Sequence, residues 1–585
     1  MRKIIRLINR FDGAQCIHGK KPFRYLNFLI SVSFLISFNS CGVKKSLEDV
    51  PDISQYEVDV PERTKVNDST FVLEDNFLTK NEQGQWELYV DGNPYELGLK
   101  SGSLTRELFK LQEDIFVGKI DSLVPSKGRQ KLLRKFLAWF NRKMYRNIDE
   151  QYKAEIYGIA QYASKDLDYI AAPYQRVMYF HGAHDIGHAL QDLALVGCSS
   201  FAAWGDRTQD GKMLIARNFD FYVGEDFADN KIIAFVAPDQ GHKFMSVTWG
   251  GFIGVLSGMN DQGLTVTINA GKSDFPLVAK TPISLVTREI LQYASTIEEA
   301  VAIAKKREVF VSESIFVGSA KDKRAAIIEV SPHNFGVYEV ENSDKLICSN
   351  HFQSAAYAKD KKNQRHILES HSQYRYERME ELLEEEPKVT PEIAVDILRD
   401  KRGLDDERIG YGNEKALNQL LAHHGIVFKP EELKVWVSSN PYQLGAFTAY
   451  DLNEVFKDVN IENDLNGEGK TSGFQIPESL SEEELKIPAD PFLRTLAYRH
   501  YQRYRKLRNQ IEKAIAFDTH LDRKVLQELR LLNPDFWEAH YLVGKYYYEK
   551  GYDRLALEAF SAAETKEITT LPDRKEVERY IRKLK

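Results

Sequence analysis

A thiol, a guanidinium and a carboxylate that could act together lie within one short stretch of the sequence. Cys198 opens an apolar run, a polar turn covers 208–212, and Arg217 and Asp220 lie on the apolar run that returns. In a hairpin the second strand lies beside the first, so both charged residues are expected near the thiol. A guanidinium favours the reactive thiolate, and a carboxylate can hold an amine or orient a proton carrier. The stretch therefore indicates a thiol site, and a buried structural cysteine beside an Arg–Asp pair is the alternative.

The elements around this stretch predict sheets layered against helices. Apolar and polar residues alternate in the segments expected as strands, and Thr296 and Glu299 have capping-box spacing at the start of one helix. The expected helices are 97–116, 130–162, 283–293 and 297–306. The expected strands are 86–90, 213–221, 243–249, 254–259, 264–269, 314–318, 325–330, 336–341 and 345–349.

Length and composition exclude several classes of protein. The 585 residues allow two to four domains at about 100–200 residues each, or one large domain with appendages. Hydrophobic residues make up 43% and aromatic residues 11%, which excludes a disordered chain. The net charge of −7 gives no general attraction to nucleic acid. Four cysteines are too few for a disulfide scaffold, and no apolar run reaches the ~20 residues of a membrane-spanning helix.

The N-terminus has the pattern of a targeting segment. A basic stretch at 2–24 precedes an apolar run at 26–38, which has the length of a signal-peptide core. The following Asn-Ser-Cys resembles a bacterial lipobox, so residues 1–40 are predicted to be a lipoprotein signal and Cys41 the lipidated residue. The lipid would anchor the protein to a membrane of the bacterial cell envelope, facing the periplasm or the surface, without spanning it. An ordinary secretory signal is the alternative, and residues 41–70, polar with scattered prolines, are predicted to be a tether.

Several motifs together resemble the cysteine N-terminal-nucleophile (Ntn) hydrolases. Gly-Cys-Ser-Ser-Phe at 197–201 is followed by Asp-Gly-Lys at 210–212 and by Ala-Arg-Asn-Phe-Asp at 216–220. The set is most similar to the autoproteolytic acyltransferases typified by acyl-coenzyme A:6-aminopenicillanic acid acyltransferase, whose relatives include bile salt hydrolases and acid ceramidases. The resemblance covers about residues 90–455. It implies an α+β fold, a four-layer αββα sandwich with residues 71–197 before the nucleophile and 198–458 as the catalytic segment.

For Cys198 the resemblance implies the role of nucleophile, with Arg217 and Asp220 orienting it. Self-cleavage of the Gly197–Cys198 bond would free an α-amine whose pKa of about 7.7–8.0 lets it accept the thiol proton near neutral pH. The thiolate would then attack an amide carbonyl and pass the acyl group from a thioester to water or to an amine. The implied activity is hydrolysis or transfer at C–N amide bonds of a small N-acyl amide, with no metal or organic cofactor. Bile salts, β-lactam side chains, N-acyl lipids and peptides all remain open as substrates.

The resemblance also implies an oxyanion hole. Gly-Met-Asn-Asp-Gln-Gly-Leu at 258–264 matches a motif of bile salt hydrolases, after which the backbone N–H of Asn269 takes the oxyanion position. Because the relatives have one more residue in between, Ala270 is the alternative. Cys-Ser-Asn-His-Phe at 348–352 resembles the segment whose asparagine, here Asn350, completes the hole.

A supporting role is implied for Arg375. It ends a Ser-x-x-Arg motif that begins at Ser372, and Arg365 and Arg378 are competitors for the same role. The interval from the nucleophile to the aspartate is a few residues longer than in the relatives, and the extra residues are placed in the turn at 206–210.

The end of the chain lies outside the resemblance. Residues 459–486 are rich in Asn, Gly, Ser and Glu and are predicted to be a linker, and residues 487–585 are predicted to be a helical tail. The segment 533–563 resembles one tetratricopeptide repeat, a helix–turn–helix unit. A single TPR-like unit cannot bury both faces, so it is expected to pack on the main domain, where it could also dock a protein partner. The rival function is a non-catalytic envelope lipoprotein with a degenerate Ntn fold and this docking tail.

The histidines carry weaker hypotheses. On a helix His181, His184 and His188 share a face that could bind zinc, but packing near the cleavage junction is the favoured interpretation. His423 and His424 are expected at the surface. No metal site is therefore predicted.

The second cysteine of the exported part, Cys348, is expected to be a small buried hydrophobe. A disulfide with Cys198 is the alternative, because exported proteins can form such bonds.

Overall fold

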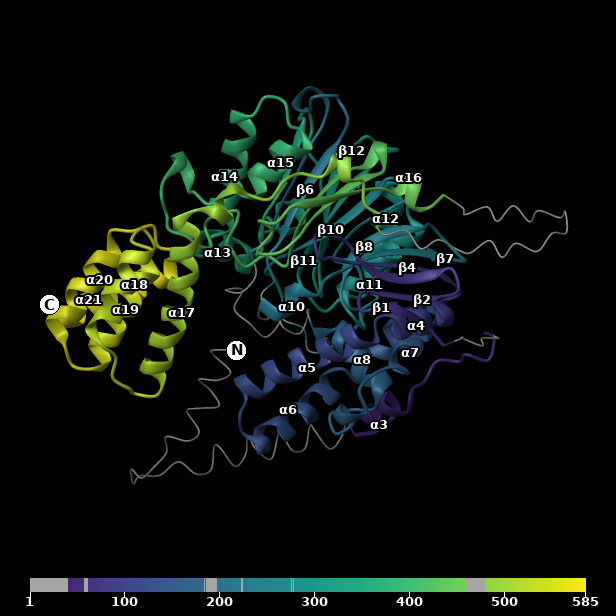
Figure 1. The fold of residues 1–585 in the computed structure, drawn as a ribbon, viewed down its shortest axis with the longest axis horizontal. Coiled ribbons are helices and arrows are strands. Elements are labelled where there is room, and N and C mark those ends of the chain that lie inside the picture. The colour runs from purple at the N-terminus through teal and green to yellow at the C-terminus, as the bar shows by residue number, and fades with distance from the viewer. Residues whose placement is uncertain are drawn as a thin grey trace.

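Two β-sheets lie face to face at the centre of the computed structural model, which describes residues 40–56, 62–183, 185, 197–221, 225–274, 276, 278–457 and 479–585 (Figure 1). Over these residues one sheet has 11 strands and the other has six. No helix within the same ranges is long and apolar enough to cross a membrane. The predicted signal, residues 1–40, lies outside the described residues except for Ser40.

The larger sheet combines strands from both sides of Cys198. β1–β4 precede that residue and β7–β13 follow it, and the two groups meet where β4 pairs in parallel with β7. In spatial order the strands are β1 (Thr64–Asn67), β2 (Thr70–Leu73), β3 (Asn76–Lys80), β4 (Trp86–Gly92), β7 (Ile232–Pro238), β8 (Phe244–Thr248), β9 (Ser257–Asn260), β10 (Leu264–Ala270), β11 (Glu313–Ser319), β12 (Arg324–Val330) and β13 (Phe335–Tyr338).

The smaller sheet contains the hairpin that begins after Cys198. In spatial order its strands are β14 (Lys345–Cys348), β5 (Ser199–Ala203), β6 (Leu214–Phe219), β15 (His424–Lys429), β16 (Lys434–Ser438) and β17 (Phe447–Asp451). β5 and β6 pair in antiparallel fashion, as predicted from the sequence.

Helices surround both sheets. Those before Cys198 are α3 (Ser40–Glu48), α4 (Pro94–Leu104), α5 (Arg106–Leu123), α6 (Lys127–Phe140), α7 (Glu150–Ala160) and α8 (Pro173–His181). Those after it, up to the tail, are α10 (Glu225–Asp229), α11 (Ile283–Tyr293), α12 (Ile297–Lys306), α13 (Lys361–Glu369), α14 (Ser372–Glu385), α15 (Pro391–Leu398) and α16 (Leu452–Val455).

Alternating side chains of β5 and β6 enter two different cores, as expected for strands. Ala202 and Ile215 face the larger sheet and pack with Phe235. Phe201 faces the other way and packs with Met379 of α14. The six-stranded sheet is therefore buried on both faces, between the larger sheet and helices α14 and α15.

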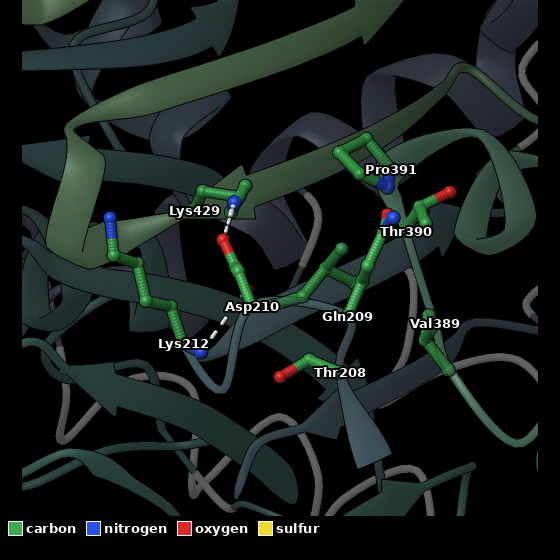
Figure 2. Close-up of a pocket in the computed structure, with 9 residues that line it drawn as sticks. Thr208, Gln209, Asp210, Lys212, Val389, Thr390, Pro391 and Lys429 are labelled. Carbon is green, nitrogen blue, oxygen red and sulfur yellow. Dashed lines mark hydrogen bonds and ion pairs between the residues drawn. The ribbon is translucent and has the colours of Figure 1, made fainter. Parts of the chain in front are cut away.

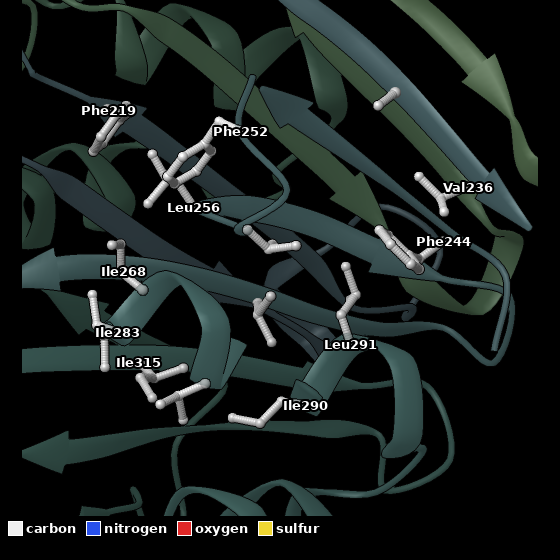
Figure 3. Packing of buried hydrophobic residues seen from close by; sticks show 14 of the residues in the cluster. Phe219, Val236, Phe244, Phe252, Leu256, Ile268, Ile283, Ile290, Leu291 and Ile315 are labelled. Atoms are coloured by element: carbon white, nitrogen blue, oxygen red, sulfur yellow. The ribbon is translucent and has the colours of Figure 1, made fainter. Parts of the chain in front are cut away.

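Helices α11 and α12 cover the outer face of the larger sheet. Ile290 and Leu291 of α11 lie in one buried cluster with strand residues such as Ile268 and Ile315 (Figure 3). Both helices have the predicted bounds, and the predicted capping box of Thr296 begins α12. The order helix, sheet, sheet, helix confirms the αββα sandwich.

The segment predicted to be a tether differs from that expectation. Residues 40–48 form α3, and Gln175 of α8 donates hydrogen bonds to the carbonyl oxygens of Leu47 and Asp49 at 3.0 and 3.1 Å. β1 lies in the same segment and belongs to the larger sheet. Polar composition suggested a free tether, but backbone hydrogen bonds to neighbouring elements fix much of it. Cys41 lies in α3, and its lipidation remains a prediction.

The C-terminal tail is helical, as predicted, and forms its own core at one end of the molecule (Figure 1). Its helices are α17 (Leu496–Ala516), α18 (Arg523–Leu532), α19 (Trp537–Glu549), α20 (Asp553–Glu564) and α21 (Leu571–Leu584). α19 and α20 form the predicted helix–turn–helix, and they approach closely because Gly544 leaves room for the Phe560 ring. Of the predicted linker, residues 458–478 lie outside the described ranges, and Leu480 donates its backbone N–H to Glu87 at 2.8 Å.

Candidate active site

Cys198 lies at the start of the β5–β6 hairpin, where its side chain is 1% exposed. The register pairs Ser200 with Arg217, and Arg217 Nη2 lies 3.7 Å from Cys198 Sγ. Burial raises the pKa of the Cys198 thiol, while the Arg217 guanidinium and a hydrogen bond from the Asp220 backbone lower it. The hairpin thus brings together the three residues that the sequence predicted to act as a unit.

Arg217 is held by two backbone carbonyls and one hydroxyl group. Its Nη1 donates to the Leu256 carbonyl at 3.0 Å and to Ser257 Oγ, its Nη2 donates to the Ile268 carbonyl, and its guanidinium carbon lies 4.3 Å from the centre of the Phe219 ring. Burial lowers the pKa of this arginine, and the neighbouring Cys198 opposes that shift. The guanidinium is therefore fixed in position and points at the thiol.

The Asp220 carboxyl is buried without a hydrogen-bond partner among the residues that the structure describes. Burial raises its pKa to about 7, although Arg375 and Arg217 both act to lower it. A buried carboxylate usually has a partner, because burial without one costs free energy. The unpartnered carboxyl beside Cys198 is thus ready to accept a cationic or hydrogen-bonding group.

Arg375 of α14 ties Cys198 to Asn350. Its Nη1 donates to the Cys198 carbonyl at 2.7 Å and to Ser199 Oγ at 2.8 Å, and its Nη2 donates to Asn350 Oδ1 at 2.5 Å. Burial lowers the pKa of this arginine to about 10. Because Oδ1 accepts from the arginine, the Asn350 amide is oriented with Nδ2 towards the end of β10, where it donates to the Ala270 carbonyl at 3.0 Å.

The two competitors of Arg375 lie elsewhere. Arg378, one turn further along α14, pairs with Asp400 and Asp406. Arg365 is exposed on α13. The structure therefore brings only Arg375, of the three, to Cys198.

The predicted oxyanion residues at the end of β10 face opposite sides. The Gly271 N–H donates to Ser312 of the segment before β11, and Asn269 pairs with Ser314 in the same register. The Ile268 carbonyl accepts from Arg217, and the Ala270 carbonyl accepts from Asn350. Since successive backbone N–H groups of a strand point to opposite sides, the Asn269 N–H belongs to the β11 ladder, and the Ala270 N–H points to the side where Arg217 contacts the Ile268 carbonyl. This direction is compatible with Ala270, the alternative that the motif spacing left open, and the choice between Asn269 and Ala270 stays a prediction.

The Asn269 side chain has a structural task. Its Nδ2 donates to the carbonyls of Cys348 and Ser349, both at 3.2 Å, and its Oδ1 accepts from Ser200 Oγ at 2.8 Å. These bonds join β10 of the larger sheet to β14 and β5 of the smaller one at the edge where Cys198 lies.

Two histidines that were expected at the surface are fully buried, which corrects that prediction. His423 and His424 share a hydrogen bond between their Nδ1 atoms at 2.9 Å, and His424 Nε2 lies 2.9 Å from Ser257 Oγ. Burial holds the pKa of both imidazoles well below the usual value. Adjacent polar residues looked like a loop, but β15 starts here beside β6, and His424 and Arg217 both contact Ser257 Oγ.

One contact to the predicted scissile bond was not expected from the sequence. Gln419 Nε2 donates to the Gly197 carbonyl at 2.9 Å. The two residues are 222 positions apart, and Gln419 belongs to no motif that would have singled it out.

Cys348 and the histidines before Cys198 were the remaining candidates from the sequence. Cys348 and Cys198 are both free thiols, so the disulfide alternative is wrong. His181 accepts the Ile253 N–H at 3.0 Å and stacks on Phe252, which supports the packing interpretation. Of the other histidines on that face, His184 and His188 lie outside the described residues, and the described part holds no cluster of three metal-ligating side chains.

A small surface pocket lies at the far end of the hairpin, away from Cys198 (Figure 2). It lies at the turn where the extra residues were placed, and Asp210 there accepts hydrogen bonds from Lys429 and from the Lys212 backbone. Both carboxylate oxygens are thus satisfied within the protein, so this pocket lacks the unpartnered groups found at Cys198.

Residues 207–441 match the model of the family described as acyl-coenzyme A:6-aminopenicillanic acid acyl-transferase. This part of the chain is therefore similar to that family. The match begins after Cys198 and contains the five other predicted catalytic residues, Arg217, Asp220, Asn269, Asn350 and Arg375.

The curated relatives that match part of this chain are distant. An uncharacterized protein of Archaeoglobus fulgidus is 28% identical over 276 residues, which is 43% of this chain and 45% of that protein. The N-acylethanolamine-hydrolyzing acid amidase of Caenorhabditis elegans is 24% identical over 207 residues, which is 34% of this chain and 56% of the amidase. The chain thus spans about half the length of the curated relatives it matches.

Solved structures with local similarity include two hydrolases. The C. elegans N-acylethanolamine-hydrolyzing acid amidase ortholog has 17% identity and a TM-score of 0.29 over 40% of this chain and 93% of that one. A mutant conjugated bile acid hydrolase of Clostridium perfringens has 14% identity and a TM-score of 0.29 over 49% of this chain and 99% of that one.

Proposed function

We propose that the protein is a self-processing cysteine amidase or acyltransferase that acts on small N-acyl amides. The observation that carries the proposal is the unpartnered, buried Asp220 carboxyl beside Cys198 and Arg217. The acyltransferase-family match over residues 207–441 supports the same class of reaction. The amidase relative is named for hydrolysing N-acylethanolamines, and we extend to this chain only the chemistry of an acyl–nitrogen bond.

Cleavage of the Gly197–Cys198 bond supplies the missing base in this proposal. The cut frees the α-amine of Cys198, which accepts the thiol proton near neutral pH. The Asp220 carboxylate then pairs with the new ammonium, which gives its buried charge a partner. Arg217 favours the thiolate for attack on the substrate carbonyl.

Two N–H donors stabilise the oxyanion that this attack creates. Asn350 Nδ2, fixed by Arg375, and the backbone N–H of Ala270 lie at the same edge of the two sheets. Collapse of the intermediate expels the amine and leaves a Cys198 thioester, which water or a second amine then resolves. The loss of one such donor typically lowers the rate about 10²–10³-fold.

The intact mass of the full chain, beside its Cys198→Ala variant, tests the proposal. We expect two wild-type fragments, one of which begins at Cys198, and an uncut variant. Cut wild type should release amine from N-acyl amides of increasing acyl length, and the variant should not. If both proteins remain single chains that hydrolyse no amide, the non-catalytic envelope protein becomes the better interpretation.

A further inference from the structure

The carbonyl group of the bond to be cut has a donor that the mechanism above does not use. Gln419 is buried and donates its Nε2 to the Gly197 carbonyl oxygen at 2.9 Å. We propose that Gln419 is a catalytic residue of self-cleavage, an inference that rests on the proposed function. Its amide N–H stabilises the negative charge that develops on the Gly197 oxygen.

Self-cleavage needs no reactant other than water. Cys198 Sγ attacks the Gly197 carbonyl carbon, and the C–O π electrons move to the oxygen that Gln419 contacts. The C–N bond then breaks, the Cys198 nitrogen takes the proton that the thiol loses, and Gly197 becomes a thioester on Sγ. Water hydrolyses the thioester, which yields the Gly197 carboxylate, the thiol and the free α-amine. A donor preplaced at the developing oxyanion lowers the barrier to the first of these steps.

Gln419 is held in place by its neighbours on both sides. Asn218 of β6 donates Nδ2 to the Leu417 carbonyl at 3.0 Å, and Asn418 accepts the Leu420 N–H at 2.9 Å. Leu420 adopts a φ of 54°, which is unfavourable for leucine, while its side chain lies in the core of the C-terminal tail. Contacts with β6 and with the core of the C-terminal tail thus fix the loop around Gln419. The loop in turn directs the Gln419 side-chain amide at the Gly197–Cys198 bond.

Gly197 has no side chain, and this leaves room for the Gln419 amide. A Cβ at this position would lie 2.0 Å from Gln419 Nε2, and it would also crowd the rest of the same amide. The clash is with the end of a flexible side chain, so an alanine would move Gln419 aside rather than the backbone. Gly197→Ala therefore breaks the hydrogen bond without changing Gln419.

The test follows cleavage of the newly made full chain over time by intact mass. The variants are Gln419→Glu, Gln419→Ala, Gly197→Ala and the double variant Gly197→Ala with Gln419→Ala. We expect each single variant to cleave about 10²–10³-fold more slowly than wild type. The double variant should be no slower than the singles, because both changes remove one interaction. Hydroxylamine, which cuts thioesters, should not restore cleavage, since the thioester is not formed.

Gln443→Glu is the matched control. Gln443 is also buried and donates Nε2 to a backbone carbonyl, that of Leu398, at 2.6 Å, but it does not contact the junction. Circular dichroism verifies that each variant is folded. If wild type cleaves and folded Gln419→Glu or Gly197→Ala cleaves at the same rate, the role of Gln419 is wrong and the proposed function stands. If wild type never cleaves, the proposed function and this inference both fail.

Discussion

The edge of the sandwich around Cys198 and the core of the C-terminal tail bury different kinds of side chain. At the edge, Arg217, Asp220 and Arg375 are fully buried, although burial of charge is costly. The tail core is aliphatic and aromatic, and an ion pair such as Arg503 with Glu528 lies at its surface. Charged groups are also buried elsewhere, as in the ion pairs Arg176–Glu113 and Arg288–Glu155, but the Asp220 carboxyl has no hydrogen-bond partner among the described residues. The difference teaches that an unpartnered buried charge lies where the chemistry is proposed, whereas the tail core is built from apolar packing.

The largest predicted effect is a loss of stability in the tail that leaves amide turnover nearly unchanged. Phe560 is fully buried and stacks on Tyr580 with ring centres 4.6 Å apart. Phe560→Ala should cost about 3–5 kcal/mol of tail stability, because it leaves a cavity. Hydrogen-exchange protection of α19–α21 measures this loss. Amide turnover per cut molecule should stay within about threefold of wild type, and a tenfold fall would make the tail part of the site.

The reverse pattern is expected at Asn350. Asn350→Ala removes the oriented Nδ2 donor and should lower amide turnover about 10²–10³-fold, equivalent to about 2.7–4 kcal/mol of activation free energy. Steady-state and single-turnover rates on an N-acyl amide measure this effect. Asn363 is a matched control, since its buried amide bonds only the Phe352 backbone. If Asn363→Ala lowered turnover equally in folded protein, the Asn350 effect would be structural.

The buried charge of Asp220 should appear as a pH dependence of stability in uncut protein. Burial raises the folded pKa to about 7, against about 3.9 in the unfolded chain. The folded state therefore holds more protons between these values, and stability falls as pH rises from 4 to 7, by up to about 1.4 kcal/mol per pH unit. Urea unfolding of Cys198→Ala across pH 4–8 should show this slope, and added Asp220→Asn should remove it. Parallel profiles of the two proteins would mean that burial does not raise the pKa of Asp220.

The smallest effect is expected at an exposed apolar side chain of the tail. Leu531 of α18 is 76% exposed. Leu531→Ala should change the free energy of unfolding by less than about 0.5 kcal/mol. The same hydrogen-exchange measurement compares it with Phe560→Ala, and a loss of similar size would contradict the distinction between tail core and tail surface.

Local patterns predicted much of the sandwich. The two helices after β10 have the predicted bounds, and the hairpin with Cys198, Arg217 and Asp220 is present because its signals lie within a few residues of one another. β7 was missed: its run Ile-Ile-Ala-Phe-Val-Ala is buried throughout, so it lacks the alternation of a half-exposed strand.

Long-range contacts could not be predicted. Gln419 reaches Gly197 only because the fold brings together two residues that are 222 positions apart. The buried His423–His424 pair follows from the pairing of β15 with β6, which no neighbouring residue indicates. The choice of Arg375 came from a motif resemblance, and its contacts with Cys198 and Asn350 agree with that choice.

The parallel pairing of β4 with β7 would hold the two pieces of the chain together after the proposed cut. Seven residue pairs from Trp86↔Ile232 to Gly92↔Pro238 join the piece before Gly197 to the piece after it. The two polypeptides would therefore stay together as one particle on native sizing and separate only in denaturant. Reassembly from denaturant would be bimolecular, and it would carry an entropic cost that the uncut chain never meets. Recovery of activity after unfolding should then depend on protein concentration for the cut protein, whereas refolding of the uncut chain should not.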